Sequence, residues 1–453
     1  MKRFLFIFFA PFLLALGIAL FLALRPPAQI TSGLLTLPDG SVVRVMAVTY
    51  GTNHVVGTAL ARMVARFPRP LRAITTRILG PRVAAQYSAT TSIPKLIVWL
   101  DRSTNGLYTP PGTGYFSASL ANARAFVSGN VQTFGSWYGN PPQLRFDVFP
   151  RRERQITLAL FERSSSGSVT NCGSLTFDNP AFANYPQWEP EPLPATKHIG
   201  DVEATLNQLS TGHGHNVNYT ALAGDRREIK FNDYPGNGDN NTICLLQLRS
   251  LTRSNEVWRV AAVEVSDATG NKTAADTLGW GGYNEGYFTF APGLWSDEAA
   301  WKLDCELKRA EGFTPEEEFT FSAVPLGALG ETNQVGWTTN FKGITVTLDY
   351  VVRRAPITNS SWSSSLLSQV HFTTSTLSNG WHLDLISARA DTSTNLNGGS
   401  WSRGANERTY DFRTIPTNAA TADFTFAAQQ SRHVTFLVKP EVGPVRLELP
   451  PQK

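Results

Sequence analysis

The sequence predicts an all-β fold, in which an N-terminal transmembrane helix precedes about three antiparallel β-sandwich modules of the immunoglobulin or fibronectin type. Three observations predict it. The chain begins with a long apolar run that contains no charge. The remainder has only 17% charged residues and many Ser, Thr, Asn, Gly and Pro residues, which is typical of short strands joined by turns. Finally, one set of motifs occurs twice in the second half of the chain, which is typical of duplicated modules.

Length and charge set limits on organisation and partners. A chain of 453 residues is too long for one hydrophobic core, so we expect several domains. Its 40 Lys and Arg residues are nearly balanced by 36 Asp and Glu residues, which leaves a net charge of +4. This weak overall field leads us to expect no nucleic-acid partner.

Residues 1–27 are expected to form a cytoplasmic tip and a transmembrane anchor. The run Phe4–Leu24 is long enough as a helix to cross the roughly 30 Å hydrocarbon core of a bilayer. Lys2 and Arg3 outnumber Arg25, which places the tip in the cytoplasm and the rest on the non-cytoplasmic side, in the periplasm or at the cell surface. A long cleaved signal peptide is the alternative, and it also exports the rest of the chain.

Residues 30–178 are predicted to form the first β module. Asp39–Gly40 lies between two β-rich runs, which is typical of a hairpin. A helical insertion is expected at 57–80, where apolar stripes alternate with arginines. Such a basic amphipathic helix either lies on the membrane surface or caps the edge of a sandwich. The arginines of this region are Arg62, Arg66, Arg69, Arg72, Arg77 and Arg82.

Prolines at 179–198 indicate a stiff linker, which is followed by a second module at 199–326 and a third at 341–450. The repeated motifs lie in these two modules, where Leu245–Asn271 of the second matches Ser368–Asn395 of the third. The matched pairs include Trp258 with Trp381, Asp267 with Asp391, and Asn271 with Asn395. An alternating strand then closes each copy, WKLDCEL from Trp301 and VTFLVKP from Val434. A weaker copy of the Asp-x-x-x-Asn pattern, Asp101 with Asn105, lies in the first module.

The second module carries Cys244, Trp258 and Cys305, an order that resembles the immunoglobulin pattern, in which a tryptophan packs on an inter-sheet disulfide. The match is partial, because Leu303 stands where that pattern has a tyrosine. A Cys244–Cys305 disulfide and two separate thiols are both open alternatives.

Three strings carry a family resemblance: LPDGSVVRVMAVTYGTNH from Leu37, DATGN from Asp267 and GLWSDEAAWKL from Gly293. With the N-terminal anchor, they resemble a group of exported, signal-anchored, multi-module envelope proteins of bacteria for which no activity is established. The resemblance covers most of the chain and implies the layout, with no site residues.

No nucleophile elbow, P-loop or dinucleotide-binding pattern is present, so we assign no catalytic residue. One loop has the oxygen ligands that calcium prefers, at Asp233, Asn237, Asp239 and Asn241. The alternative is a hairpin insertion that turns at Asn237–Gly238. We predict no other cofactor, and we expect the Asp-x-x-x-Asn loops to stabilise their own turns.

Aromatic residues in glycine-rich loops are the remaining candidate site. They follow the Asp-x-x-x-Asn loops and are suited to stack on a sugar or anchor a protein, with burial in the loop as the alternative. These residues are Trp137, Tyr138, Trp280, Tyr283 and Trp401.

The sequence therefore favours a non-catalytic, membrane-tethered protein of the cell envelope, whose modules bind a protein partner or have a structural role. A carbohydrate-recognition array that binds polysaccharide through the loop tryptophans is the first alternative. A hydrolase with carboxylates in a cleft between modules is the second.

Overall fold

The structure is a computed structural model of the chain. It describes residues 34–37, 40, 42–57, 64, 66–79, 87–104, 107–108, 115–121, 126–132, 143–163, 169–213, 217–221, 227–231, 240–275, 287–290, 293–354, 367–375, 377, 380–392, 394–396, 398–404, 406–413, 415–442 and 447–449. Within these residues no helix is long and apolar enough to cross a membrane, and the run Phe4–Leu24 lies outside them.

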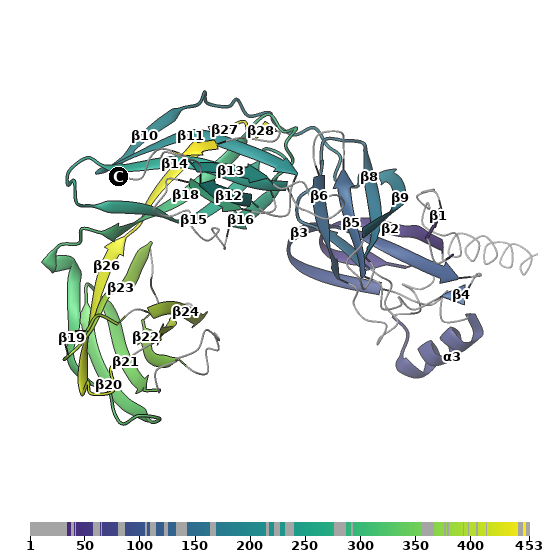
Figure 1. Cartoon of the computed structure of the whole chain (residues 1–453). Helices are drawn as coiled ribbons and strands as arrows, with labels where there is room; N and C mark the ends of the chain where they lie inside the picture. The colour runs from purple at the N-terminus through teal and green to yellow at the C-terminus, as the bar shows by residue number, and fades with distance from the viewer. Residues whose placement is uncertain are drawn as a thin grey trace, which may run out of the picture.

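The fold is all-β, as the sequence predicted, and its sheets are antiparallel apart from one short parallel pairing. The strands form three bodies that follow one another in an arch, with the second body in the middle (Figure 1). One hydrophobic cluster runs through the first and second bodies and includes Phe146, Phe177, Trp258 and Phe436. The third body has its own cluster, centred on phenylalanines such as Phe372 and Phe426.

The first body is one curled nine-stranded sheet with the order β1-β2-β3-β7-β6-β5-β8-β9, in which β4 pairs with β3. The curl brings the first strand next to the last. Leu35 of β1 packs so closely on Gly173 of β9 that a Cβ atom at position 173 would collide with the Leu35 side chain. The helix α3 lies within the predicted insertion at 57–80. The elements are β1 (Leu35–Thr36), β2 (Val42–Val56), α3 (Arg69–Leu79), β3 (Tyr87–Thr104), β4 (Leu107–Tyr108), β5 (Tyr115–Ala121), β6 (Phe126–Gln132), β7 (Gln143–Phe146), β8 (Gln155–Arg163) and β9 (Val169–Asp178).

The second body contains two larger sheets, β10-β11-β14-β17 and β16-β15-β18-β27, and a small sheet β12-β13-β29. The short strand β28 pairs with β11. Its elements are β10 (Ala195–Ile199), β11 (Val202–His213), β12 (Val217–Ala221), β13 (Arg227–Phe231), β14 (Asn240–Ser250), β15 (Val257–Asp267), β16 (Lys272–Ala275), β17 (Tyr287–Phe290), β18 (Trp301–Glu311), β27 (Arg432–Val438), β28 (Glu441–Val442) and β29 (Leu447–Leu449).

The third body contains the sheets β19-β26-β23 and β20-β21-β22-β25-β24. Its elements are the 3-10 helix η1 (Pro315–Glu317), β19 (Glu318–Pro325), β20 (Thr332–Phe341), β21 (Ile344–Val352), β22 (Ser368–Thr374), β23 (Trp381–Ala390), β24 (Gly398–Gly404), β25 (Glu407–Phe412) and β26 (Thr421–Gln430).

Strand β18 shows why these segments form half-buried strands. Alternate residues Trp301, Leu303, Cys305 and Leu307 are buried, as the sequence predicted, while the charged residues between them are partly exposed. Strand β27 follows the same rule with Val434, Phe436 and Val438 buried.

The chain path corrects the predicted third module at 341–450. Strand β27 was expected to close that module, but it pairs with β18 of the second body, with Leu303 opposite Phe436. Strands β28 and β29 also pair with second-body strands, β11 and β13. The third body is therefore an insertion between β18 and β27, and the second body is built from two separate stretches of chain.

The second and third bodies share a pattern of strand pairing over the predicted repeat, but the last strand of the pattern differs from the predicted one. In the second body β14 pairs with β17 and β15 pairs with β18, and in the third body β22 pairs with β25 and β23 with β26. The strand equivalent to β18 is thus β26 rather than β27. The first body has a single sheet path instead, so its pairing does not follow this pattern.

Charged side chains connect the second and third bodies. The Nε2 of His382 lies 2.7 Å from Oε1 of Glu306, and Lys308 donates to Asp384 over 2.8 Å. Burial raises the pKa of Glu306, but the hydrogen bond from His382 and the charge of nearby His433 outweigh it, so the net pKa lies below its ordinary value. The pKa of Asp384 is also lowered, because the charge of Lys308 outweighs the effect of burial.

These shifts predict that acid weakens the connection between the second and third bodies. A carboxylate whose pKa is depressed in the folded state stabilises it above the unfolded-state pKa, 4.5 for Glu306, and this stability is lost as the pH falls below that value. We expect Glu306→Gln to lower the free energy of unfolding by about 1.5–3 kcal/mol at pH 7. The free energy of unfolding of this variant should also decrease less on acidification than that of the unmodified protein. Urea unfolding at neutral and acidic pH measures both effects.

Glu264→Gln is the control, because Glu264 forms an exposed ion pair with Lys272 on the same body. If the free energy of unfolding depends on pH in the same way in Glu306→Gln, in Glu264→Gln and in the unmodified protein, the connection does not depend on the charge of Glu306.

Candidate functional site

A cleft of about 230 Å³ lies between the second and third bodies, and we call it the interbody cleft. Its volume is below the roughly 300–1,000 Å³ usual for drug-sized ligands, so it suits a small group. The lining includes four cationic, two anionic and two tryptophan side chains. The lining residues are Asp201, Arg253, Trp258, Arg309, Glu317, Lys342, Trp381, Ala428, Gln429, Gln430 and Arg432.

Arg309, near the end of β18, connects the two bodies beside the cleft. Its side chain is only 6% exposed, and it donates to Oε1 of Glu256 over 2.7 Å and to Oε1 of Glu317 over 2.5 Å. Its backbone N–H donates to Gln429, whose side-chain amide donates back to the backbone carbonyl of Arg309, each over 2.7 Å. The guanidinium also lies over the rings of Trp258 and Phe313.

Glu256 is fully buried behind the cleft and is held by several donors. The hydroxyl of Ser250 donates to it over 2.6 Å, and Arg253 forms a further ion pair. Burial raises the pKa of Glu256, but hydrogen bonds from Ser250, Arg309 and Trp258 outweigh it, so the net pKa is lowered. The pKa of Glu317 is also lowered. Burial raises it, but hydrogen bonds from the Thr314 backbone and from Arg309 outweigh that effect.

These two glutamates are thus ionised counter-ions of arginine. A glycosidase needs one carboxylic acid with a raised pKa to protonate the leaving group, and neither glutamate meets that requirement.

Cationic groups exceed anionic groups along the lining. Lys342 lies at the turn between β20 and β21, with its ammonium 5.5 Å from the centre of the Phe341 ring. The Nε of Arg432 lies 3.7 Å from Asp201. The Nε of Arg309 is buried and has no hydrogen-bond partner among the described residues. An anionic group is therefore the ligand that this lining favours.

The sequence repeat marks this cleft, although its role was missed from sequence. Trp258 begins the repeat strand β15 opposite Arg309, and Trp381 begins the equivalent strand β23 opposite Gln430. All four line the cleft, so the equivalent ends of the two repeats meet there. The arginines that define its charge had no sequence signal of their own.

Most of the predicted site residues lie outside the described residues. This applies to the aromatic candidates Trp137, Tyr138, Trp280 and Tyr283, and to the calcium candidates Asp233, Asn237 and Asp239. Trp401 lies in β24 opposite Thr409, and Asn241 lies in β14 opposite Gly212. In the part of the chain that the structure describes, no three His, Cys, Asp or Glu side chains form a metal-binding group. The loop-aromatic and calcium sites stay predictions.

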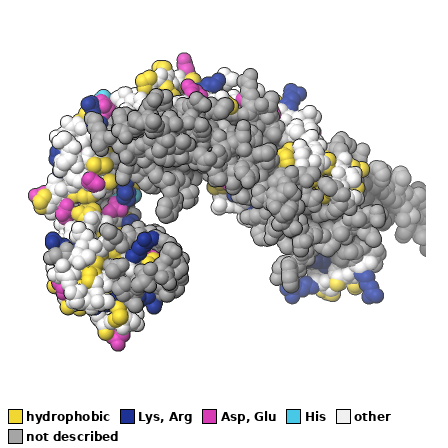
Figure 2. Space-filling model, viewed as in Figure 1, with side chains coloured by type: hydrophobic (Ala, Val, Ile, Leu, Met, Phe, Trp, Pro, Cys, Tyr) yellow, Lys and Arg dark blue, Asp and Glu magenta, His cyan; other side chains and the backbone are white. Residues whose placement is uncertain are grey.

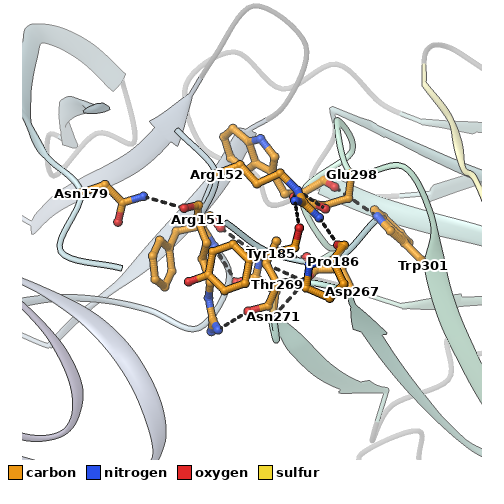
Figure 3. A network of polar contacts seen from close by, with 12 residues as sticks. Arg151, Arg152, Asn179, Tyr185, Pro186, Asp267, Thr269, Asn271, Glu298 and Trp301 are labelled. Atoms are coloured by element: carbon orange, nitrogen blue, oxygen red, sulfur yellow. Dashed lines mark hydrogen bonds and ion pairs between the residues drawn. The ribbon is translucent and has the colours of Figure 1, made fainter. Parts of the chain in front are cut away.

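The Asp267-x-x-x-Asn271 loop has a wider role than the predicted local turn (Figure 3). The carboxylate of Asp267 does accept local hydrogen bonds, from the backbone of Thr269 over 2.9 Å and of Asn271 over 3.1 Å. Asn271 in addition reaches the first body, where it accepts from the N–H of Phe149 over 3.2 Å and donates to its carbonyl over 2.9 Å. Asn271 is completely buried. The loop therefore joins the first body to the second.

Two arginines of the first body complete this junction. Arg151 donates to the carbonyl of Thr269 over 2.8 Å. Arg152 binds both carboxylate oxygens of Glu298 and donates to the carbonyls of Tyr185 and Pro186 (Figure 3). The N–H of Glu191 donates to the carbonyl of Leu437 in β27 over 2.6 Å, so the proline-rich linker predicted at 179–198 contacts both bodies.

Cys244 and Cys305 are separate thiols, so the disulfide considered between them is not formed in this structure. Both are fully buried in the core of the second body, whereas Cys172 is partly exposed. Burial, together with the charge of Asp304, raises the pKa of Cys305 to about 12. Burial and the proximity of Cys305 raise the pKa of Cys244 well above its ordinary value.

We predict that Asn271→Ala lowers the free energy of unfolding by on the order of 3 kcal/mol, because it leaves the N–H and carbonyl of Phe149 buried without partners. Urea unfolding followed by tryptophan fluorescence measures the loss. The repeat provides the control: Asn395 occupies the matching position and is exposed, so Asn395→Ala should cost no more than about 0.5 kcal/mol. Equal losses would contradict a junction role for Asn271.

We also predict that iodoacetamide labels Cys172 alone in the folded protein and all three cysteines in denaturant without reductant, because only the thiolate of an accessible cysteine reacts. Intact mass spectrometry counts the labels. If two cysteines stay unlabelled in denaturant until a reductant is added, the buried pair is a disulfide after all.

No protein-family model matches the chain, and no curated protein matches its sequence.

Proposed function

We propose that the chain is an exported, membrane-tethered, non-catalytic binding protein that holds an acidic sugar in the interbody cleft. The observation that supports this most directly is the composition of the cleft, where arginine and lysine side chains exceed carboxylates and two tryptophans share the lining.

The charge of the cleft selects the ligand class. Both glutamates near Arg309 are committed to arginines, and Lys342 and Arg432 lie on the same lining. A carboxylate or phosphate on the ligand would add hydrogen bonds of the strong, charge-assisted kind. Glu256, Glu317 and Asp201 lie beside the three arginines of the lining, so Lys342 is the cation that an anionic group of the ligand would contact first.

Trp381 and the small volume of the cleft support a sugar ring rather than a peptide. Trp381 is half-buried: it packs against the hydrophobic cluster of the third body and also lines the cleft. An amphipathic indole ring suits the apolar face of a sugar, while the charged groups contact its substituents. An acidic sugar combines these two features in one small group.

The proposal also includes a membrane tether and a sandwich fold for the second and third bodies. The run Phe4–Leu24 with Lys2 and Arg3 before it supports a tether whose remaining chain is exported. The paired sheets of the second and third bodies, with matching strand order, support sandwiches of the immunoglobulin or fibronectin type.

The test is a glycan array that carries acidic and neutral sugars, probed with the full-length protein in detergent. We expect binding to acidic sugars only, weakened about tenfold or more by Lys342→Glu, since the reversal adds a like charge beside the ligand. Added salt should weaken binding further.

Lys439→Glu is the matched control, because this exposed lysine follows β27 at the end opposite Arg432. It makes the same charge change without changing the cleft. Absence of binding, equal binding to neutral sugars, or equal effects of the two substitutions would overturn the proposal.

A further inference from the structure

The helix α3 is the only α-helix longer than one turn among the described residues, and its charges all have one sign. Its sequence, RPLRAITTRIL, contains three arginines and no acidic residue. An isolated helix shorter than about 12–15 residues is marginally stable in water, and a helix in a protein usually depends on burial of its apolar face. A partner surface for α3 is therefore expected.

The apolar stripe of α3 is not covered by the described part of the protein. Leu71 is 53% exposed and Ile74 is 56% exposed. The two residues are three positions apart, so they lie on one side of the helix. At 3.6 residues per turn, Arg69, Arg72 and Arg77 lie around the other sides, and all three are exposed.

This patch projects from the edge of the first body. Figure 1 shows α3 at the end of that body that faces away from the second body. In Figure 2 basic side chains surround hydrophobic ones at the same place. The interbody cleft is lined only by residues of the second and third bodies, so α3 has no part in it.

The chemistry of the patch fits one kind of surface. The three arginines give α3 a positive charge that favours an anionic surface, and Arg72 also donates to the carbonyl of Phe67. The adjacent apolar side chains need an apolar layer directly beneath that anionic surface. The boundary between anionic lipid headgroups and acyl chains has both layers at the depth that an interfacial helix reaches. The apolar run Phe4–Leu24 precedes β1 by a short stretch of chain, so the proposed tether would keep the first body near a bilayer.

We propose that α3 lies on an anionic membrane surface, with Leu71 and Ile74 inserted among the lipids and the arginines in contact with headgroup phosphates. This contact rests on the tether part of the proposed function and is independent of the ligand of the cleft. It would give the protein a second attachment to the membrane and fix the orientation of the first body.

The test uses the full-length chain in vesicles, with Cys172→Ser and a polarity-sensitive fluorophore on Ile74→Cys. One set of vesicles is phosphatidylcholine, and the other also contains phosphatidylglycerol. We expect a blue shift and quenching by nitroxide lipids in the anionic vesicles only. The combined Arg69→Gln, Arg72→Gln and Arg77→Gln variant should reduce the ratio of bound to free helix by on the order of 100-fold.

A label on Leu329→Cys, which is 51% exposed in the third body, is the control and should stay in water throughout. Resistance to alkaline extraction reports the tether separately, so a failed tether and a failed helix contact are distinguishable. Two results with a tethered chain would overturn the proposal. In the first, the label at position 74 stays in water in both kinds of vesicle. In the second, the label is quenched equally in both kinds of vesicle, or equally when the arginines are replaced.

Discussion

The arrangement of the second and third bodies depends on the burial of one arginine. Moving a guanidinium out of water costs several kcal/mol, and Arg309 is stable there because Glu256 and Glu317 neutralise it and aromatic rings cover it. Glu256 belongs to the second body, and Glu317 lies in the segment that enters the third. Loss of either carboxylate would leave a buried charge without its counter-ion. The relative position of the bodies, and with it the interbody cleft, follows from this constraint.

The two junctions of the arch rely on ion pairs to different extents. The first and second bodies share one hydrophobic cluster, and they are joined by the neutral amide of Asn271 and by one ion pair between Arg152 and Glu298. The second and third bodies have separate clusters and are joined mainly by ion pairs. Salt and acid act on ion pairs more than on neutral contacts. The junction beside the cleft is therefore the more sensitive of the two to salt and pH.

Local pattern was enough to predict the strands and their buried sides, because alternation fixes which face of a strand meets the core. Trp301, Cys305 and Phe436 were placed correctly on this basis. Alternation does not say which sheet a strand joins, so β27 was assigned to the third module although it pairs with β18. The cleft escaped prediction for the same reason, since Arg253, Arg309 and Arg432 come together only through distant strand pairing.

The insertion of the third body also governs the order in which the chain can fold. Domains generally fold as units from the N-terminus as the chain emerges, but β18 lacks its neighbour β27 until the whole third body has been made. The third body can thus be complete while the second still has an open sheet edge. Until β27 arrives, that edge presents unpaired backbone groups beside Leu303 and Leu307, and such edges are where chains aggregate. Early folding of the insertion brings the start of β27 close to β18 and shortens the period in which this edge is open.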